Sequence, residues 1–278
     1  MSDHAFRIVN VFAQSRLAGN PLCVFESAGG MDEATMQALA LQFNLSETTF
    51  ILPSAQASAR VRIFTPTFEM AFAGHPTLGS AHVVRALSGA GDRITLEMKA
   101  GVIPVQASGD AWTLEANAPR FRVPDARPDE LAAMLGLTAD DMLADPLWVD
   151  TGSEQLVIPL ASPAAVERAM PNAQLMLRHA SNASRAMAYV FSRHGNTALA
   201  RFFFLKHGGV VEDPGTGSAC ANLGGWLIAT GAGLPQRLQI DQGRHVGRAC
   251  NLGLEVSVDR RIRVSGRVIE IARGVVVL

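Results

Sequence analysis

Three ionisable residues occupy positions where proton-transfer chemistry is commonly built. Glu47 opens a β-rich apolar stretch at 48–52, His75 lies inside Gly74-His75-Pro76, and Asp213 precedes Pro214. Partial burial of a carboxylate at the start of such a strand would raise its pKa towards neutrality, which suits a general acid or base. An imidazole titrates near pH 6.5 and suits proton transfer or carboxylate binding. We therefore take Glu47, His75 and Asp213 as candidate catalytic residues.

Each candidate also has an ordinary structural explanation. Glu47 could be a solvated loop carboxylate, as most glutamates are. His75 could be a turn residue bonded to the backbone, held extended by the proline that follows it. Asp213 could be the N-cap of a helix, and its neighbour Glu212 forms a like-charge pair with it that could raise one pKa.

Two glycine-punctuated turns place these residues. The segment 72–81 runs into an apolar, helix-like stretch at 81–87, and the segment 212–219 runs into another at 220–228. A strand, tight turn and helix N-terminus present backbone N–H groups at the positive end of a helix dipole, which suits an anion such as a carboxylate. The offset between Gly79 and Gly217 is 138 residues, so the pattern predicts a duplicated fold with a site between the halves.

The remaining elements repeat in the same order in the two halves. In the first, strands are expected at 6–12, 22–25, 48–52 and 59–64, with a helix capped by Asp32 and ending at Phe43, and a hairpin at 94–98 and 102–107. A proline- and charge-rich linker is expected at 119–128, before strands at 147–152 and 155–160 and a helix capped by Ser162. The last β-rich stretch is 268–277.

Composition excludes several classes of protein. Lys and Arg total 24 against 25 for Asp and Glu, and the formal net charge of −1 gives no electrostatic case for nucleic acid or an anionic membrane as partner. No apolar run approaches 18 residues, and residues 1–5 lack the basic region of a signal peptide. With three cysteines that have no paired spacing, we expect a cytoplasmic protein.

Cofactor and metal motifs are not evident in the sequence. Gly215-x-Gly217 lacks the third glycine and acidic residue of a dinucleotide fingerprint. The histidines at 179, 194, 207 and 245 show no ligand spacing, so no metal site is expected. Cys220 lies where the helix dipole could lower a thiol pKa, but we expect it to be a small buried helix residue. A small-molecule carboxylate is the expected partner.

Five motifs in order along nearly the whole chain resemble the phenazine biosynthesis PhzF-like family. They are Val9-Asn10-Val11-Phe12 with Gly19-Asn20-Pro21, Asn44-Leu45-Ser46-Glu47-Thr48, Gly74-His75-Pro76-Thr77-Leu78-Gly79, the stretch 212–219, and Gln242-Gly243 with Gly247-Arg248. The family shares the diaminopimelate epimerase fold. The resemblance implies an α+β protein of two pseudo-symmetric domains, each a curled, mostly antiparallel sheet around a central helix. Residues 1–118 with 266–278 would form the first domain, 119–265 the second, and the cleft between them the active site.

The resemblance also implies a function in a biosynthetic process. The namesake activity is a cofactor-independent isomerisation of trans-2,3-dihydro-3-hydroxyanthranilate, in which a glutamate moves a proton between ring carbons. Carried over by motif, Glu47 is the acid/base, and His75 and Asp213 assist it. Backbone amides around Gly74, Gly217, Ser218 and Ala219 would hold the substrate carboxylate. The family further implies a homodimer and no cofactor.

Two other functions remain open from the sequence. The chain could be an amino-acid or hydroxy-acid epimerase or racemase that uses Glu47 with a second group, or it could bind a small acid without turnover. Epimerases of this fold use one cysteine from each half, whereas the turns here carry Gly74-His75 and Asp213-Pro214. The sequence therefore favours an isomerase that acts through Glu47.

Overall fold

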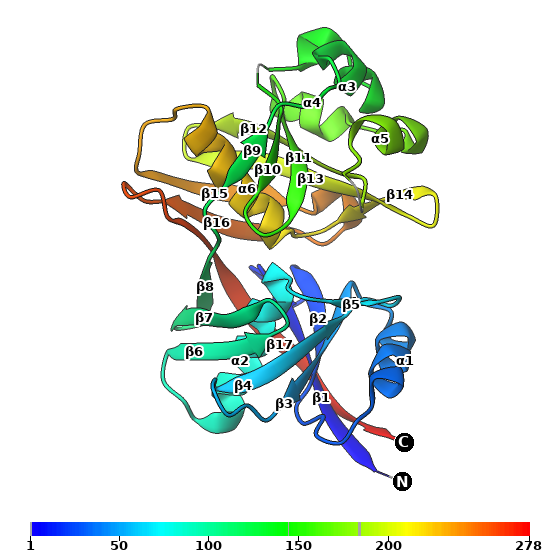
Figure 1. The fold of residues 1–278 in the computed structure, drawn as a ribbon, viewed down its shortest axis with the longest axis vertical. Coiled ribbons are helices and arrows are strands. Elements are labelled where there is room, and N and C mark those ends of the chain that lie inside the picture. Colours follow the sequence, from blue (N-terminus) through cyan, green and yellow to red (C-terminus); the bar gives the residue numbers. More distant parts are fainter. Residues whose placement is uncertain (1, 144, 183–184) are drawn as a thin grey trace. The chain divides into compact units, whose positions relative to one another are not determined.

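The protein forms two compact units. The computed structural model describes residues 2–143, 145–182 and 185–278, and Met1, the first residue of the predicted N-terminal domain, lies outside them. The first unit contains the chain through Glu115 together with Ser265–Leu278, and the second contains Ala116–Val264 (Figure 1). Of the helices formed by these residues, none is long and apolar enough to cross a membrane.

The sheet of the first unit closes on itself. Strands β1, β2, β3, β4, β6, β7 and β8 pair in this order, and β17 pairs with both β8 and β1. Pairs β2–β3 and β4–β6 are parallel, and pairs β1–β2, β3–β4, β6–β7, β7–β8 and β1–β17 are antiparallel. The strands are β1 (Asp3–Val11), β2 (Asn20–Phe25), β3 (Glu47–Leu52), β4 (Ala59–Phe64), β5 (Glu69–Met70), β6 (Arg93–Met98), β7 (Gly101–Ser108), β8 (Ala111–Glu115) and β17 (Ile262–Val277).

One helix lies inside this sheet and another covers its outside. All residues of 74–81 are buried in α2 (Gly74–Ser88), and α2 contacts β1, β2, β3, β4, β6, β7 and β8. A helix buried all round its axis belongs to the interior. The outer helix α1 (Glu33–Phe43) is amphipathic and packs Met36 and Leu39 against Phe25 and Phe50. Asp32 caps α1 by accepting a hydrogen bond from the Thr35 backbone, as predicted.

The second unit repeats this plan with more helices. Its central helix is α6 (Gly217–Ala229), and α3 (Pro128–Met134), α4 (Pro163–Arg168) and α5 (Ala173–His179) pack into a separate apolar core with the sheet. Short 3₁₀ helices are η1 (Ala139–Asp141) and η2 (Arg244–Val246). The strands are β9 (Arg120–Arg122), β10 (Leu147–Asp150), β11 (Glu154–Pro159), β12 (Met187–His194), β13 (Thr197–Lys206), β14 (Gly209–Asp213), β15 (Gln236–Gln242) and β16 (Cys250–Val256).

The order of strand pairing is the same in the two units. The parallel pair β2–β3 is joined through α1, and the parallel pair β11–β12 is joined through α4 and α5. Each unit has a second parallel pair that is joined through its central helix. In the first unit α2 joins β4 to β6, and in the second unit α6 joins β13 to β15. Parallel strands need a crossover connection, and here a helix supplies it each time. The α+β fold with mostly antiparallel sheets around central helices is therefore as the sequence predicts.

Both central helices begin earlier than the sequence predicts. Helix α2 starts at Gly74 instead of residue 81, and α6 starts at Gly217 instead of residue 220. His75 is consequently the second residue of a helix, and the prediction that Pro76 holds it extended is wrong. The first turn of a helix does not use its N–H groups internally, so Pro76 as the third residue costs the helix no hydrogen bond.

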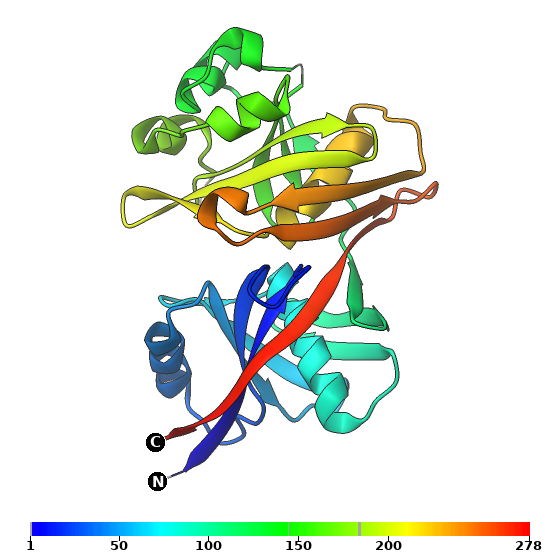
Figure 2. The ribbon, with the colours of Figure 1, turned by 180° about the vertical axis from the view of Figure 1, so that it is seen from behind.

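Two further segments differ from, or extend, the sequence-based prediction. The stretch 119–128 is not only a linker, because β9 within it pairs with β10 and Pro128 starts α3. At the other end of the chain, β17 is one continuous strand whose residues Val268–Val277 pair with β1. Figure 2 shows β1 and β17 side by side, with both chain ends together.

Candidate active site

Glu47 and His75 lie against each other within the first unit. Glu47 is the first residue of β3, and its side chain is 15% exposed. His75 projects from the first turn of α2 and is almost fully buried. His75 Nε2 lies 3.3 Å from Glu47 Oε2, and His75 Nδ1 lies 3.4 Å from the Asn20 side-chain nitrogen. The structure thus brings together two of the three predicted catalytic residues.

His75 is uncharged at neutral pH. Burial lowers the pKa of His75 to about 3, although a hydrogen bond to the Pro21 backbone acts in the opposite direction. The contact with Glu47 is therefore one between a neutral imidazole and a carboxyl group, not an ion pair. A neutral imidazole beside Glu47 brings no fixed positive charge that would oppose proton uptake by the carboxylate.

The buried His75 should make folding weaker in acid. Between pH 6.5 and about 3 the unfolded chain binds a proton at residue 75 that the folded chain does not, so stability falls as pH falls through this window. Between pH 7.5 and 4.5 the contribution is about 2–3 kcal/mol. Urea unfolding should show that His75→Gln reduces this pH dependence, while the exposed His245→Gln leaves it as in the wild type. An equal slope in His75→Gln and the wild type would contradict the buried neutral state.

Asp213 is held in the second unit by a chain of side-chain hydrogen bonds. It is the last residue of β14, and its Oδ2 accepts a hydrogen bond of 2.5 Å from the Thr216 hydroxyl. Gln242 Nε2 donates to the Thr216 hydroxyl at 3.1 Å and to the Asp213 backbone carbonyl at 2.9 Å. Thr216, not Asp213, is the N-cap residue of α6, so the N-cap interpretation of Asp213 is wrong. The carboxylate is instead oriented by Thr216 and Gln242.

Gly243 packs directly against the turn that follows Asp213. Its φ is +80°, and a Cβ at this position would lie 2.3 Å from the Pro214 carbonyl oxygen and 2.4 Å from that of Arg248. Only glycine fits such a close approach of three backbone segments in a left-handed conformation. The Gln242-Gly243 motif therefore packs against the Asp213-Pro214 turn and fixes its position.

The predicted substrate-binding residues lie at the starts of the two central helices. Gly74 is the first residue of α2, and Gly217, Ser218 and Ala219 are the first three of α6. The N-cap residues, Ala73 and Thr216, make no side-chain capping bond to these first turns. Backbone N–H groups in both first turns can therefore donate to an anion.

A buried amide network supports the start of α6. Gln155 Nε2 donates to the Ser218 hydroxyl at 2.9 Å, and Asn222 Nδ2 donates to Gln155 Oε1 at 2.8 Å. Asn222 Oδ1 accepts from the Thr151 hydroxyl at 2.7 Å and from its backbone N–H at 3.0 Å. Because the Ser218 hydroxyl accepts from Gln155, its own proton is directed elsewhere and is available to a ligand.

The structure also shows how Glu212 and Asp213 lie relative to each other and to the helices. Glu212 and Asp213 do not act as a like-charge pair, because Glu212 bonds to Arg201 at 2.7 Å and successive strand residues point to opposite faces. His75 and Asp213 also occupy different places relative to the central helices of their units. His75 is the second residue of its helix, whereas Asp213 lies before the first residue of α6.

The thiols are buried and have little nucleophilic character. Cys220 is the fourth residue of α6 and is fully buried, and Cys23 and Cys250 are also buried. Burial raises the pKa of all three thiols, which outweighs any effect of the helix dipole on Cys220. Cys220 is thus the buried helix residue that the sequence predicts.

Native protein should therefore resist alkylation. At pH 8 iodoacetamide should modify the three thiols at least about 100-fold more slowly than in urea, because the thiolate is the reactive form. Mass spectrometry of the intact protein counts the added groups. Rapid labelling of Cys220 in the native protein would contradict the buried, protonated thiol. Cys220 would then be a candidate base.

The structure has a cavity that does not coincide with these residues. It has a volume of about 380 Å³, lies in the second unit beside the C-terminal end of α6, and is lined by Phe191 and Trp226 among others. Its lining contains none of the predicted site residues, and those of the second unit lie at or just before the N-terminal end of α6. The cavity is therefore not where the predicted chemistry is placed.

Several residues of the site were not found from the sequence. Asn20 and Gln242 stand in motifs already noted, but their contacts join positions 55 and 26 residues apart in the chain. Thr216 could have been noticed, because a hydroxyl three residues after an aspartate is a common local hydrogen-bond pattern. Nothing in the sequence around Gln155 or Asn222 predicts that these residues belong to the site.

Comparisons with known proteins show which sequences and structures this chain resembles. The family model of phenazine biosynthesis-like proteins (PhzC-PhzF) matches residues 9–274. An uncharacterised isomerase of Pasteurella multocida is 37% identical over 278 residues, covering 99% of this chain and 94% of the relative. The trans-2,3-dihydro-3-hydroxyanthranilate isomerase of Pseudomonas aeruginosa is 34% identical over 253 residues, covering 88% of this chain and 87% of that enzyme.

A solved structure shows the same fold. The crystal structure of a PhzF-family phenazine biosynthesis protein from Bacillus anthracis superposes with a TM-score of 0.89 at 24% identity, over 100% of each chain. The match of the family model along nearly the whole length, together with the motifs and the fold, identifies the chain. It belongs to the PhzC-PhzF family of phenazine biosynthesis-like proteins.

Proposed function

We propose that this protein is a cofactor-independent isomerase that moves a proton on a small carboxylate, with Glu47 as the acid/base. The isomerase class is supported by the relatives, which are named isomerases. The contact of 3.3 Å between Glu47 Oε2 and His75 Nε2, at the buried start of α2, is the observation that carries the assignment. It places a carboxyl group and a neutral hydrogen-bonding group together, which suits reversible proton transfer.

The proposed reaction needs no redox partner. Glu47 as carboxylate removes a proton from a substrate carbon, and the electron pair left behind shifts into an adjacent double bond. Glu47 as carboxylic acid then returns the proton to a carbon at the other end of the shifted bond. His75 assists by hydrogen bonding, and Asp213, oriented by Thr216, assists at a polar group of the substrate. Donors in the first turns of α2 and α6 hold the substrate carboxylate.

The substrate class follows from the named relative and from the donors. We propose that the substrate is a cyclic, amino-substituted carboxylate similar to trans-2,3-dihydro-3-hydroxyanthranilate. The relative from Pseudomonas aeruginosa is named as an isomerase of that compound. The first-turn N–H groups suit its carboxylate, and the Asp213 carboxylate suits an amino or hydroxyl group.

Proton exchange in deuterated water tests the proposal. The protein is incubated with dihydrohydroxyanthranilate and with a panel of cyclic and acyclic amino and hydroxy acids, and NMR follows both the double-bond position and deuterium content. A shifted double bond supports the proposed isomerase. Exchange at a stereocentre without a new isomer would instead show an epimerase, and binding of an acid without exchange or product would show a non-catalytic binding protein.

A further inference from the structure

The same pair of side chains precedes both central helices. In the first unit Arg62 on β4 binds Glu69 on β5 through two contacts of 2.7 Å. In the second unit Arg201 on β13 binds Glu212 on β14 through contacts of 2.7 and 3.2 Å. Both pairs are bidentate, a geometry that fixes direction as well as distance. We call them the first and second Arg–Glu clamps.

The two clamps occupy the same position relative to the helix that follows. Glu69 stands five residues before Gly74, the first residue of α2 (74 − 69 = 5). Glu212 stands five residues before Gly217, the first residue of α6 (217 − 212 = 5). Each clamp therefore binds the short strand that precedes a central helix. This strand is β5 before α2 and β14 before α6.

The strand register is also the same in both clamps. Glu69 is paired with Phe64 and Glu212 with Phe203, and each arginine lies two residues before that phenylalanine. The guanidinium carbon of Arg62 lies 5.1 Å from the Phe64 ring centre, and that of Arg201 lies 4.7 Å from the Phe203 ring centre. Stacking on the ring restricts the arginine further.

Both glutamates are nearly buried, with side chains that are 6% and 8% exposed. Burial opposes ionisation of Glu69, but hydrogen bonds from Arg62 and Lys99 outweigh it and hold the pKa of Glu69 below its usual range. Removing charges from water offsets much of what such a pair contributes to stability. A role in fixing geometry therefore explains the two buried pairs better than stability does.

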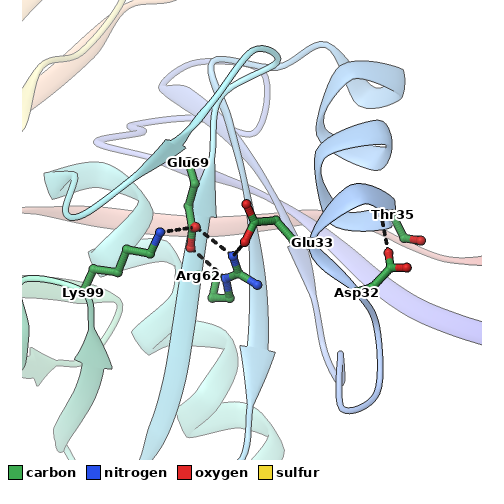
Figure 3. A network of polar contacts seen from close by, with 6 residues as sticks. All are labelled: Asp32, Glu33, Thr35, Arg62, Glu69 and Lys99. Carbon is green, nitrogen blue, oxygen red and sulfur yellow. Dashed lines mark hydrogen bonds and ion pairs between the residues drawn. The ribbon is translucent and has the colours of Figure 1, made fainter.

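Each arginine also ties an outer helix to the clamp. Figure 3 shows Arg62 between Glu69 and Glu33, which belongs to the first turn of α1, and Lys99 on the far side of Glu69. Arg201 Nη1 donates to three carbonyl oxygens around the end of α4, those of Val166, Glu167 and Ala169. Helix α1 follows β2 in the first unit, and helix α4 follows β11 in the second unit. The two helices therefore have the same place in the element order of their units.

We propose that the two Arg–Glu clamps position the catalytic groups, by fixing the point from which each central helix starts. The first clamp sets Gly74 and His75 through the short connection from β5. The second sets Asp213 directly, because Asp213 is bonded in the chain to Glu212. The proposal rests on the proposed function, since it concerns the placement of His75 and Asp213.

A third pair in the chain offers a matched control. Arg122 binds Glu154 through contacts of 2.8 and 3.1 Å, and its guanidinium carbon lies 4.6 Å from the Trp148 ring centre. The two groups are the same as in the clamps, but their side chains are more exposed, at 48% for Arg122 and 29% for Glu154, and neither strand leads into a central helix. Arg122→Lys therefore changes a bidentate, ring-stacked pair that does not precede α2 or α6.

Amide hydrogen exchange of the free protein tests the positioning without any substrate. We expect Arg201→Lys to speed exchange in residues 213–221, and Arg62→Lys to speed it in residues 70–80, by roughly tenfold. Arg122→Lys should leave both segments as in the wild type. Unchanged exchange in the clamp variants, or an equal change in the control, would overturn the proposal. Because no turnover is involved, this result stands even if the proposed reaction is wrong.

Kinetics then separate positioning from stability. Arg201→Lys should lower kcat by about 10–100-fold with a smaller change in KM, at temperatures well below unfolding, because displacing a catalytic group by an ångström has such an effect. The double variant Arg201→Met with Glu212→Met removes both charges together but also the hydrogen bonds from Arg201 to the carbonyls around α4, so its kcat is measured well below its own unfolding temperature, where it should stay slow. Recovery of wild-type kcat in this double variant would show that the clamp only stabilises.

Discussion

Glu47→Gln should lower kcat by about 10²–10⁴-fold, the effect expected when a general acid or base is removed. Glutamine keeps the size of the side chain and its hydrogen bonding but cannot exchange a proton. Since the neighbouring His75 is neutral, the change breaks no ion pair between these two residues, and KM and folding should be little affected. Steady-state rates and deuterium transfer measure the effect.

The control for this experiment is a carboxylate in the same unit. Glu97→Gln changes a strand glutamate that accepts a hydrogen bond from Ser54 and belongs to no proposed catalytic group. It should keep the wild-type rate within a factor of about two. If Glu47→Gln retains wild-type turnover, the acid/base assignment is wrong, and His75 or Asp213 would have to carry the proton.

Gly243→Ala should disrupt the second unit at the Asp213 turn. The left-handed backbone costs an alanine about 1–2 kcal/mol, and relief of the clash with two carbonyl oxygens adds about 1–3 kcal/mol. Because one of those oxygens belongs to Pro214, the turn must move and Asp213 with it. We expect lower stability in urea and a fall in kcat of about 10–100-fold.

Gly247→Ala separates the two causes. Gly247 has a φ of +69°, close to that of Gly243, but a Cβ there would meet nothing within 4 Å. It should therefore lose only the stability that the left-handed backbone costs, and its kcat should stay unchanged. Equal effects of the two substitutions on kcat would show that the Pro214 contact does not position Asp213.

Local chemistry allowed much of the fold to be predicted. The caps of α1 and α4, Asp32 and Ser162, satisfy backbone N–H groups three residues later and act over one turn. Strand alternation and glycine turns are equally local, so the strands on both sides of each turn could be located from pattern alone. The motif around Glu47 also placed this residue at the start of a strand, which the structure confirms.

Helix starts were predicted less well because burial decides them. Residues 74–81 contain two glycines and a proline, which are poor helix formers. They form the first turns of α2 nonetheless, because closure of the sheet around them buries every one of these residues. Backbone groups enclosed in this way must pair with each other, and the helix achieves this.

For this protein, the sequence by itself determined the local elements, the two helix-initiating turns and the identities of Glu47, His75 and Asp213 as candidates. Only the tertiary structure decided their state. Burial makes His75 neutral and the thiols unreactive, Gln242 binds the Thr216 hydroxyl that donates to Asp213, and Arg201 binds Glu212. Desolvation and long-range hydrogen bonds depend on which segments meet in space, and a local pattern does not contain that information.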